Sequence, residues 1–287
     1  MATVREIRRR VRSVTSIAKV TKAMELVAGS KMRRSQSRAL AARPYAEKMM
    51  EILGDLAKYR GDEDETHPFL TVRPVNNTLI LYLGPNRGLA GGLPSNMNRK
   101  AAAFALEQES TVAFVTSGRK GRDFVVRAGQ PLAAEFSMPE YPNLADTLAM
   151  TRIVVDEYEA GRVDRVYLLY PHFVNTAVQV AAVRQILPIE PQDIEDKTAK
   201  DIDYIFEPSP QGVLAELLPR YIEMTIYQAV LETEASELSA RMVAMRNATD
   251  AANDMIQSLT LIYNKVRQEQ ITKELLDIVG GVEAMSA

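Results

Sequence analysis

The side chains that most often perform enzymatic chemistry are scarce in this chain. It has no Cys among its 287 residues, and its two His residues are His67 and His172. The lack of Cys excludes a thiol nucleophile, a disulfide framework and a Cys-ligated zinc or iron–sulfur site. Neither His has a base or nucleophile near it in sequence, and no two carboxylates stand out as an acid–base pair. We therefore expect a protein with no catalytic residue, no metal site and no cofactor, in which both His residues lie on the surface or in loops.

One glycine-rich segment lies where a nucleotide-binding fold would hold phosphate. Residues 84–93 (GPNRGLAGGL) follow a predicted strand and precede a predicted helix. Their spacing matches neither G-x-G-x-x-G nor G-x-x-x-x-G-K-S/T. Gly118-Arg119-Lys120, after the second predicted strand, could imitate the recognition of a ribose phosphate. We favour a tight turn here, and a nucleotide-dependent α/β enzyme with a coiled-coil arm remains an alternative.

Opposite charges are concentrated in different parts of the chain. Residues 1–60 hold 15 Lys and Arg against 5 Asp and Glu, whereas the remaining residues hold 20 against 32. Such a basic arm suits an import presequence, a nucleic-acid arm or a rod that faces acidic protein. The apolar periodicity begins at Val4 and runs through the Arg residues, which argues against a cleaved presequence. No aromatic residue precedes Tyr45 to stack on bases, yet an RNA-binding protein that uses the basic helix remains a second alternative.

The middle of the chain alternates strand and helix signals. Predicted strands cover residues 78–83, 111–116, 132–136, 163–170 and 176–187, and predicted helices cover 95–107, 119–128 and 144–159. Short continuous runs of Val, Leu and Ile are typical of strands covered on both faces. We expect a Rossmann-like α/β domain with a mostly parallel sheet and an antiparallel edge. No segment of the sequence is long and apolar enough to span a membrane.

A long helix precedes this domain. Its apolar residues follow one another at spacings of three or four, namely Val4, Ile7, Val11, Val14, Ile17, Val20, Met24 and Val27. An extra step of three near Ile17 would overwind a coiled-coil seam there. Pro44 removes a backbone donor, so we expect it to kink or break the helix before a second segment over residues 45–58.

The C-terminal part of the chain carries a longer helix with a coiled-coil pattern. Sixteen positions from 214 to 266 are spaced alternately by three and four, and all of them except Gln228 and Thr249 are apolar. An ordinary surface helix does not sustain such a register over more than seven heptads. We expect Pro219 in the first turn of this helix and Gly280-Gly281 at its end.

The two seams cover each other most simply as an antiparallel coiled coil. The chain would then consist of an N-terminal helix (1–60), a linker (61–76), an α/β domain (77–207) and a C-terminal helix with its tip (208–287). Beyond Val266 the longer helix would outrun its partner and continue as a single helix. The seam positions on which this prediction depends are Ile7, Val11, Val14, Leu231, Leu238, Met242, Met245, Ile256, Leu259 and Val266.

Several segments resemble one known family, the gamma subunit of the F-type ATP synthase. They are residues 20–31 (VTKAMELVAGSK), 87–93 (RGLAGGL), 204–210 (YIFEPSP), 218–221 (LPRY), 240–250 (ARMVAMRNATD), 263–268 (YNKVRQ) and 271–274 (ITKE). The resemblance covers essentially the whole chain. The chain departs from the family pattern in the glycine-rich segment, where Pro85-Asn86 replaces Ser-Asp or Thr-Asp and Ala90 replaces a Cys. It also lacks the regulatory insert and Cys pair of the chloroplast form.

The resemblance implies a non-catalytic central rotor. The coiled coil would turn inside a hexamer of alpha and beta subunits, and the α/β domain would form a foot bound to the epsilon subunit and the proton-carrying ring. Rotation of the ring would thereby be coupled to ATP synthesis or hydrolysis in the hexamer. The resemblance also implies a peripheral location at the cytoplasmic face of a bacterial cell membrane, with no membrane insertion and no nucleic-acid partner.

The family motifs assign contact roles to eight residues. Arg267 and Gln268 match positions that engage a beta-subunit loop near the top of the shaft, with Arg241 and Met24 as further beta-subunit contacts. The foot region facing epsilon and the ring would include Tyr204, Ile205, Phe206 and Glu207.

Overall fold

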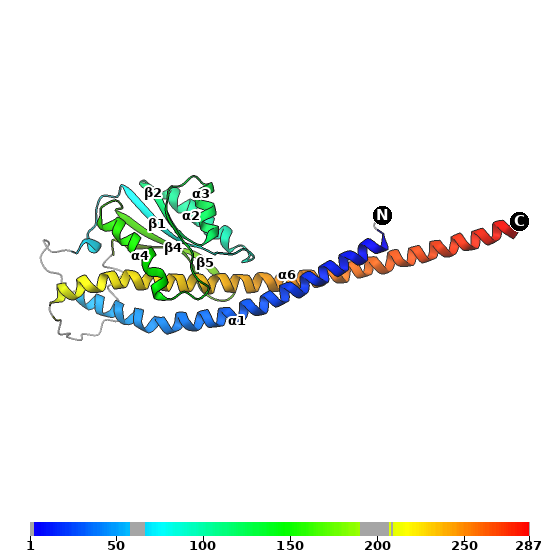
Figure 1. Cartoon of the computed structure of the whole chain (residues 1–287), viewed down its shortest axis with the longest axis horizontal. Coiled ribbons are helices and arrows are strands. Elements are labelled where there is room, and N and C mark those ends of the chain that lie inside the picture. The colour runs from blue at the N-terminus through cyan, green and yellow to red at the C-terminus, as the bar shows by residue number, and fades with distance from the viewer. Residues whose placement is uncertain (1–2, 58–66, 190–206, 208, 287) are drawn as a thin grey trace. The chain divides into compact units, whose positions relative to one another are not determined.

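The computed structural model describes residues 3–57, 67–189, 207 and 209–286. They form two compact units, one made of Met1–Ala28 with Met242–Ala287 and the other of Gly29–Arg241. Two long helices, α1 (Val4–Ala57) and α6 (Pro210–Ser286), each contribute to both units (Figure 1). Across these described ranges no helix is long and apolar enough to cross a membrane.

The second unit is built around a five-stranded sheet. Its strands are β1 (Asn77–Leu83), β2 (Thr111–Ser117), β3 (Leu132–Phe136), β4 (Arg165–Phe173) and β5 (Gln179–Leu187). They lie in the order β3-β2-β1-β4-β5, and every neighbouring pair is parallel except β4–β5. The predicted parallel sheet with an antiparallel edge is therefore confirmed. β5 begins later than predicted because Asn175 Oδ1 accepts hydrogen bonds from the N–H groups of Ala177 and Val178 and holds a turn there.

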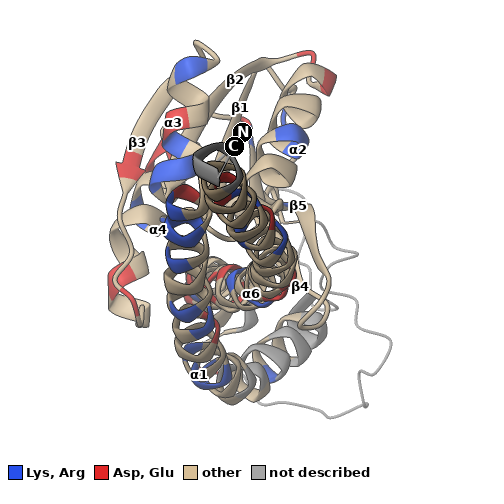
Figure 2. Cartoon of the chain, turned by 90° about the vertical axis from the view of Figure 1, so that its right-hand side faces the viewer, with Lys and Arg blue, Asp and Glu red and all other residues tan. Residues whose placement is uncertain are grey.

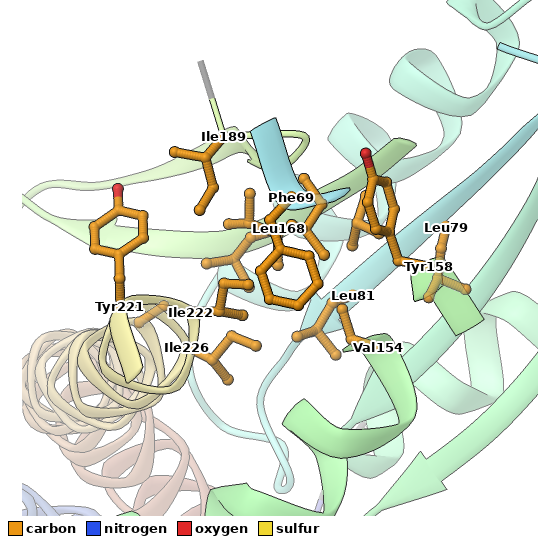
Figure 3. Close-up of a cluster of buried hydrophobic side chains, with 14 of the residues drawn as sticks. Phe69, Leu79, Leu81, Val154, Tyr158, Leu168, Ile189, Tyr221, Ile222 and Ile226 are labelled. Atoms are coloured by element: carbon orange, nitrogen blue, oxygen red, sulfur yellow. The ribbon is translucent and has the colours of Figure 1, made fainter. Parts of the chain in front are cut away.

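Helices cover both faces of this sheet, as the apolar strands predict. Even-numbered β1 residues such as Ile80 and Tyr82 pack in a core with α2 (Leu93–Glu107) and α3 (Arg119–Arg127). Odd-numbered residues such as Leu79 and Leu81 pack on the opposite face with α4 (Leu144–Glu159) and α6 (Figure 3). This alternation follows from the two-residue period of a strand.

The core that contains α6 recruits one residue from a segment without a strong structural signal. A short 3₁₀ helix, η2 (Pro68–Leu70), inserts Phe69 between the sheet and Tyr158 of α4, with the two ring centroids 6.3 Å apart (Figure 3). Ile189 N–H donates to Phe69 O at 2.7 Å. Phe69 is fully buried, so this part of the predicted linker is a component of the core.

The structure corrects two expectations about prolines, namely a break of the first helix at Pro44 and a first-turn position for Pro219. Helix α1 continues through Pro44 without a break, and α6 begins at Pro210 and contains Pro219 in its interior rather than in its first turn. A proline inside a helix costs one backbone hydrogen bond and introduces a steric clash. Most of the stability of a helix in a protein comes from packing rather than from intrinsic propensity. Each helix is packed on one side of its proline, since Leu53, nine residues after Pro44, and Leu218, next to Pro219, are fully buried.

The expected end of α6 is also wrong. The helix runs through Gly280 and Gly281 to Ser286. Each glycine disfavours a helix by about 1 kcal/mol relative to alanine but does not forbid it. Neither glycine has a positive φ, so neither adopts the left-handed cap conformation that would end the helix.

Candidate functional site

The glycine-rich loop (residues 84–93) connects β1 to α2 and is fastened to the turn between β2 and α3. Gly84 N–H donates to Ser117 O at 2.8 Å, and Lys120 N–H donates to Pro85 O at 3.2 Å. A Cβ on Gly118 would lie 2.2 Å from Gly84 O, and the φ of +103° at this residue also favours glycine. Gly118 therefore permits close approach of two backbone segments.

A carboxylate accepts the backbone donor that a phosphate would need at this loop. Asn86 N–H donates to Glu237 Oε2 of α6 at 3.1 Å. Arg119, which could have bound a ribose phosphate, donates from Nε to Asn86 Oδ1 at 3.3 Å. Both groups are thus used within the chain, which favours the tight-turn interpretation over a nucleotide-dependent enzyme.

In the first unit, α1 and α6 pair as antiparallel helices through a polar layer. Thr249 Oγ1 of α6 donates to Thr21 Oγ1 of α1 at 2.8 Å, and both residues are buried. Arg246 Nε lies 3.7 Å from Glu25 Oε1, and Lys22 Nζ lies 3.0 Å from Glu25 Oε2. Because residue numbers rise along α1 as they fall along α6, the two helices run in opposite directions.

This polar layer corrects the predicted register of α1. The buried stripe continues from Val14 through Ala18, Thr21, Glu25 and Ala28 at alternating spacings of four and three. No overwinding step occurs at Ile17, which is 52% exposed, and Val20 and Val27 are also exposed. The hydrogen bond and ion pairs described above compensate for the burial of Thr21 and Glu25. These two polar residues therefore occupy the buried stripe, and the apolar residues Ile17, Val20 and Val27 lie outside it.

The predicted seam positions are buried to different degrees. Ile7, Leu231, Leu238 and Met245 are buried. The others are half-buried, namely Val11, Val14, Met242, Ile256, Leu259 and Val266. Every described side chain from 267 to 282 is exposed, although this part of α6 is helical. Within this unit α6 thus extends past its contact with α1 as a single helix.

The residues expected to contact other subunits differ in their surroundings. Arg267 and Gln268 are exposed on the single-helix part of α6, and Met24 is half-buried. Arg241 is 13% exposed, because its guanidinium is held by Glu237 and by Gly88 O. Glu207 is exposed. Three predicted foot residues lie outside the described part of the chain: Tyr204, Ile205 and Phe206.

Part of the basic arm has a structural role that sequence reasoning missed. Lys and Arg residues recur along the described part of α1 (Figure 2). Three of them, one or two helical turns apart, fasten the loop between β3 and α4. Lys31 pairs with Glu140, Arg34 stacks on Tyr141 with its Cζ 5.3 Å from the ring centroid, and Arg38 Nη2 donates to Pro142 O at 2.5 Å. The hydrogen bond from Lys31 holds the pKa of Glu140 below its usual value.

Both His residues have structural partners. His67 caps η2 by accepting a hydrogen bond from Phe69 N–H at Nδ1, and burial lowers the pKa of this imidazole. His172 Nδ1 lies 2.7 Å from Glu232 Oε2 and links β4 to α6. Within the described residues no group of three or more His, Cys, Asp or Glu side chains could hold a metal ion.

Comparisons with known proteins identify the family. A family model described as ATP synthase matches residues 3–285. The ATP synthase gamma chains of Dehalococcoides mccartyi strain BAV1 and Roseiflexus sp. RS-1 are 48% and 46% identical to this chain. Each alignment covers 100% of this chain and at least 99% of the relative.

Solved structures give the same fold. The rotor of the Euglena gracilis mitochondrial ATP synthase has a chain that matches with a TM-score of 0.68 at 20% identity, covering 93% of this chain and 98% of that one. The central stalk of the Tetrahymena thermophila enzyme gives 0.61 at 25% identity, covering 80% and 99%. Together with the full-length relatives, these matches show that the chain belongs to the ATP synthase gamma chain family, whose members are non-catalytic subunits of the central stalk.

Proposed function

We propose that the chain is a rotor shaft that turns inside a hexamer of alpha and beta subunits and couples ring rotation to ATP synthesis or hydrolysis. The observation that carries this proposal is the apolar outer surface of the α1–α6 coil. Of the 22 large apolar side chains that are exposed in the described chain, 13 lie in the first unit, which is much the smaller of the two. Exposed apolar side chains at such density are typical of a protein interface.

The exposed apolar side chains lie on both helices of that unit. Those of α1 are Ile17, Val20, Leu26 and Val27, and those of α6 are Met255, Leu261, Ile262, Ile271, Leu275, Leu276, Ile278, Val279 and Val282. These side chains point outward on several faces of the coil, since no single helical stripe contains them all. A ring of subunits around the coil would cover them better than one partner on one side.

Coupling requires that each shaft orientation favours a different beta-subunit conformation. A straight rod with identical sides could not do this. The coil is asymmetric, because α6 continues alone beyond Val266 and carries Arg267 and Gln268 on its exposed surface. Charge-assisted hydrogen bonds from such side chains contribute about 1.5–3 kcal/mol each, enough to bias one conformation without locking the shaft.

The finer assignments of partners rest on the family resemblance. We place the α/β domain against the epsilon subunit and the proton-carrying ring, with the contact near residues 204–207. The complex would then lie at the cytoplasmic face of a bacterial membrane, with this subunit peripheral to the bilayer. The absence of native Cys makes these contacts testable, since a single introduced Cys is a unique cross-linking or labelling position.

The decisive experiment observes rotation. Glu109→Cys provides an attachment point on an exposed residue between α2 and β2. The labelled chain is assembled with alpha and beta subunits, the hexamer is fixed to a surface, and ATP is added. Stepwise rotation of the probe that stops when ATP is withheld supports the proposal. A chain that assembles but stays still while the hexamer hydrolyses ATP would refute it.

A further inference from the structure

An ion pair on α6 holds the glycine-rich loop by its backbone. Glu237 Oε1 lies 2.5 Å from Arg241 Nη2, one helical turn away. The second oxygen of Glu237 accepts from Asn86 N–H at 3.1 Å, and Arg241 Nη2 also donates to Gly88 O at 3.3 Å. We name this arrangement the Glu237–Arg241 latch. It joins one helix to two backbone groups that flank Arg87.

The latch is shielded from water, unlike most ion pairs on the surface of a protein. The side chains of Glu237 and Arg241 are 16% and 13% exposed, compared with 30% and 58% for the pair Glu157–Arg162. Partly buried charges stabilise a structure only when they pair with each other and with further hydrogen-bonding groups. Here the further groups are supplied by the loop, so the latch and the loop position each other.

The loop is held in a conformation that its own sequence does not favour. Leu89 has a φ of +65°, and no other non-glycine residue in the described chain has a positive φ. Such a backbone persists only where the surroundings determine it. Leu89 is also 60% exposed, so burial of its side chain is not the cause. The adjacent Ala90 is buried in the core with α2, and the latch secures the opposite flank at Asn86 and Gly88.

We propose that Glu237 and Arg241 are positioning residues that fix the glycine-rich loop to α6, so that the helix and the loop move as one body. Gly84 N–H fastens the loop to Ser117 at the end of β2, and Pro85 O accepts from Lys120 N–H at the start of α3. A turning force on α6 therefore also reaches the sheet through this latch. The positioning itself is a property of the chain alone. Its consequence for coupling rests on the proposed rotor function.

The latch is tested with Glu237→Ala, Arg241→Ala and the double variant. The matched control is Arg220→Ala, which breaks an ion pair with Glu223 on the same helix away from the loop. Amide hydrogen exchange is measured on the full-length chain in the assembled complex. We expect exchange in residues 84–93 to accelerate about tenfold or more in each latch variant. The control and the β1 strand should exchange as in the unmodified protein.

A second readout separates positioning from general stability. The double variant should accelerate loop exchange little more than either single variant, because both changes open the same latch. Glu237→Gln keeps an acceptor for Asn86 N–H and should restore part of the protection. Unchanged loop exchange in Glu237→Ala and Arg241→Ala would overturn the proposal. If either alanine variant does not fold, the test uses loop exchange in Glu237→Gln, which removes the charge of the ion pair. Exchange equal to that of the unmodified protein in this variant would also overturn the proposal.

The consequence for coupling is measured as ATP-driven proton pumping per ATP hydrolysed, in vesicles that contain the full complex. We expect this ratio to fall at least about twofold in Glu237→Ala, which keeps Arg241 as a possible beta-subunit contact, and to remain unchanged in Arg220→Ala. Faster loop exchange with a normal ratio would overturn the coupling role of the latch. Failure of the unmodified chain to rotate in the assembled complex would instead refute the rotor function, while the exchange data would still report on the latch.

Discussion

Glu234 of α6 has a carboxylate that its surroundings only partly satisfy. Its Oε2 accepts from Ser35 Oγ of α1 at 3.2 Å, whereas Oε1 is buried and has no hydrogen-bond partner in the described structure. Burial raises the pKa of Glu234 to about 7. The hydrogen bond from Ser35 and the charge of Arg38 oppose this shift, and the neighbouring Glu140 and Glu237 add to it. The carboxyl therefore titrates close to neutral pH.

The raised pKa makes the stability of the fold depend on pH. A carboxyl whose pKa is higher in the folded chain binds its proton more tightly there. This tighter proton binding stabilises the folded chain. The stabilisation is fully present below pH 4.5, the pKa of the carboxyl in the unfolded chain, and is lost as the pH rises through 7. Without solvent screening, the difference between the folded and unfolded pKa values corresponds to about 3 kcal/mol of stability. Because the side chain is only half-buried, solvent screening reduces this to about 1–2 kcal/mol.

Replacing Glu234 by Gln removes the titration and keeps the shape of the side chain. We expect Glu234→Gln to raise the free energy of unfolding, relative to the unmodified chain, by about 1–2 kcal/mol more at pH 8.5 than at pH 4.5. Urea unfolding followed by circular dichroism at both pH values measures this difference. The control is Glu216→Gln, an exposed residue of the same helix. A stability difference for Glu234→Gln that does not change with pH would refute the reasoning.

Three further predictions concern the coil, its tip and the turn between β2 and α3. Leu238→Asp places an unpaired charge at a buried position and should lower the free energy of unfolding by several kcal/mol. Arg246→Ala changes a side chain that is 70% exposed and should lower the free energy of unfolding, measured by urea unfolding, by less than about 1 kcal/mol. Equal losses for Leu238→Asp and Arg246→Ala would contradict the register. Arg267→Ala with Gln268→Ala should leave the helix content of the free chain unchanged and impair ATP synthesis in reconstituted vesicles; normal synthesis with the variant fully incorporated would count against a contact role. Gly118→Ala should lower the melting temperature strongly, because its Cβ would lie 2.2 Å from Gly84 O, and an unchanged melting temperature would show that the turn can rearrange.

The periodicity of the sequence was sufficient to predict the types of the main elements. Helical spacing of apolar residues indicated two long helices, and β-rich runs between turn residues indicated a sheet covered on both faces. The predicted bounds of residues 111–116, 132–136 and 144–159 agree with β2, β3 and α4 to within one residue. The period at which side chains return to the same face of a helix or a strand is a local property of the backbone, which is why the types of these elements can be read from the sequence.

The tertiary structure decided what each helix face touches. The sequence favoured Ile17 and Val20 as seam residues, yet the hydrogen bond between Thr21 and Thr249 places polar residues in the seam and leaves the apolar ones outside. The contacts of Glu237 and Arg241 with the glycine-rich loop join residues about 150 positions apart. Helical periodicity specifies that a stripe of residues will be covered, but the energy of burying a polar group depends on its partner across the interface. Only the folded chain brings such partners together, and so it alone determined the register, the latch and the passage of both helices through their prolines.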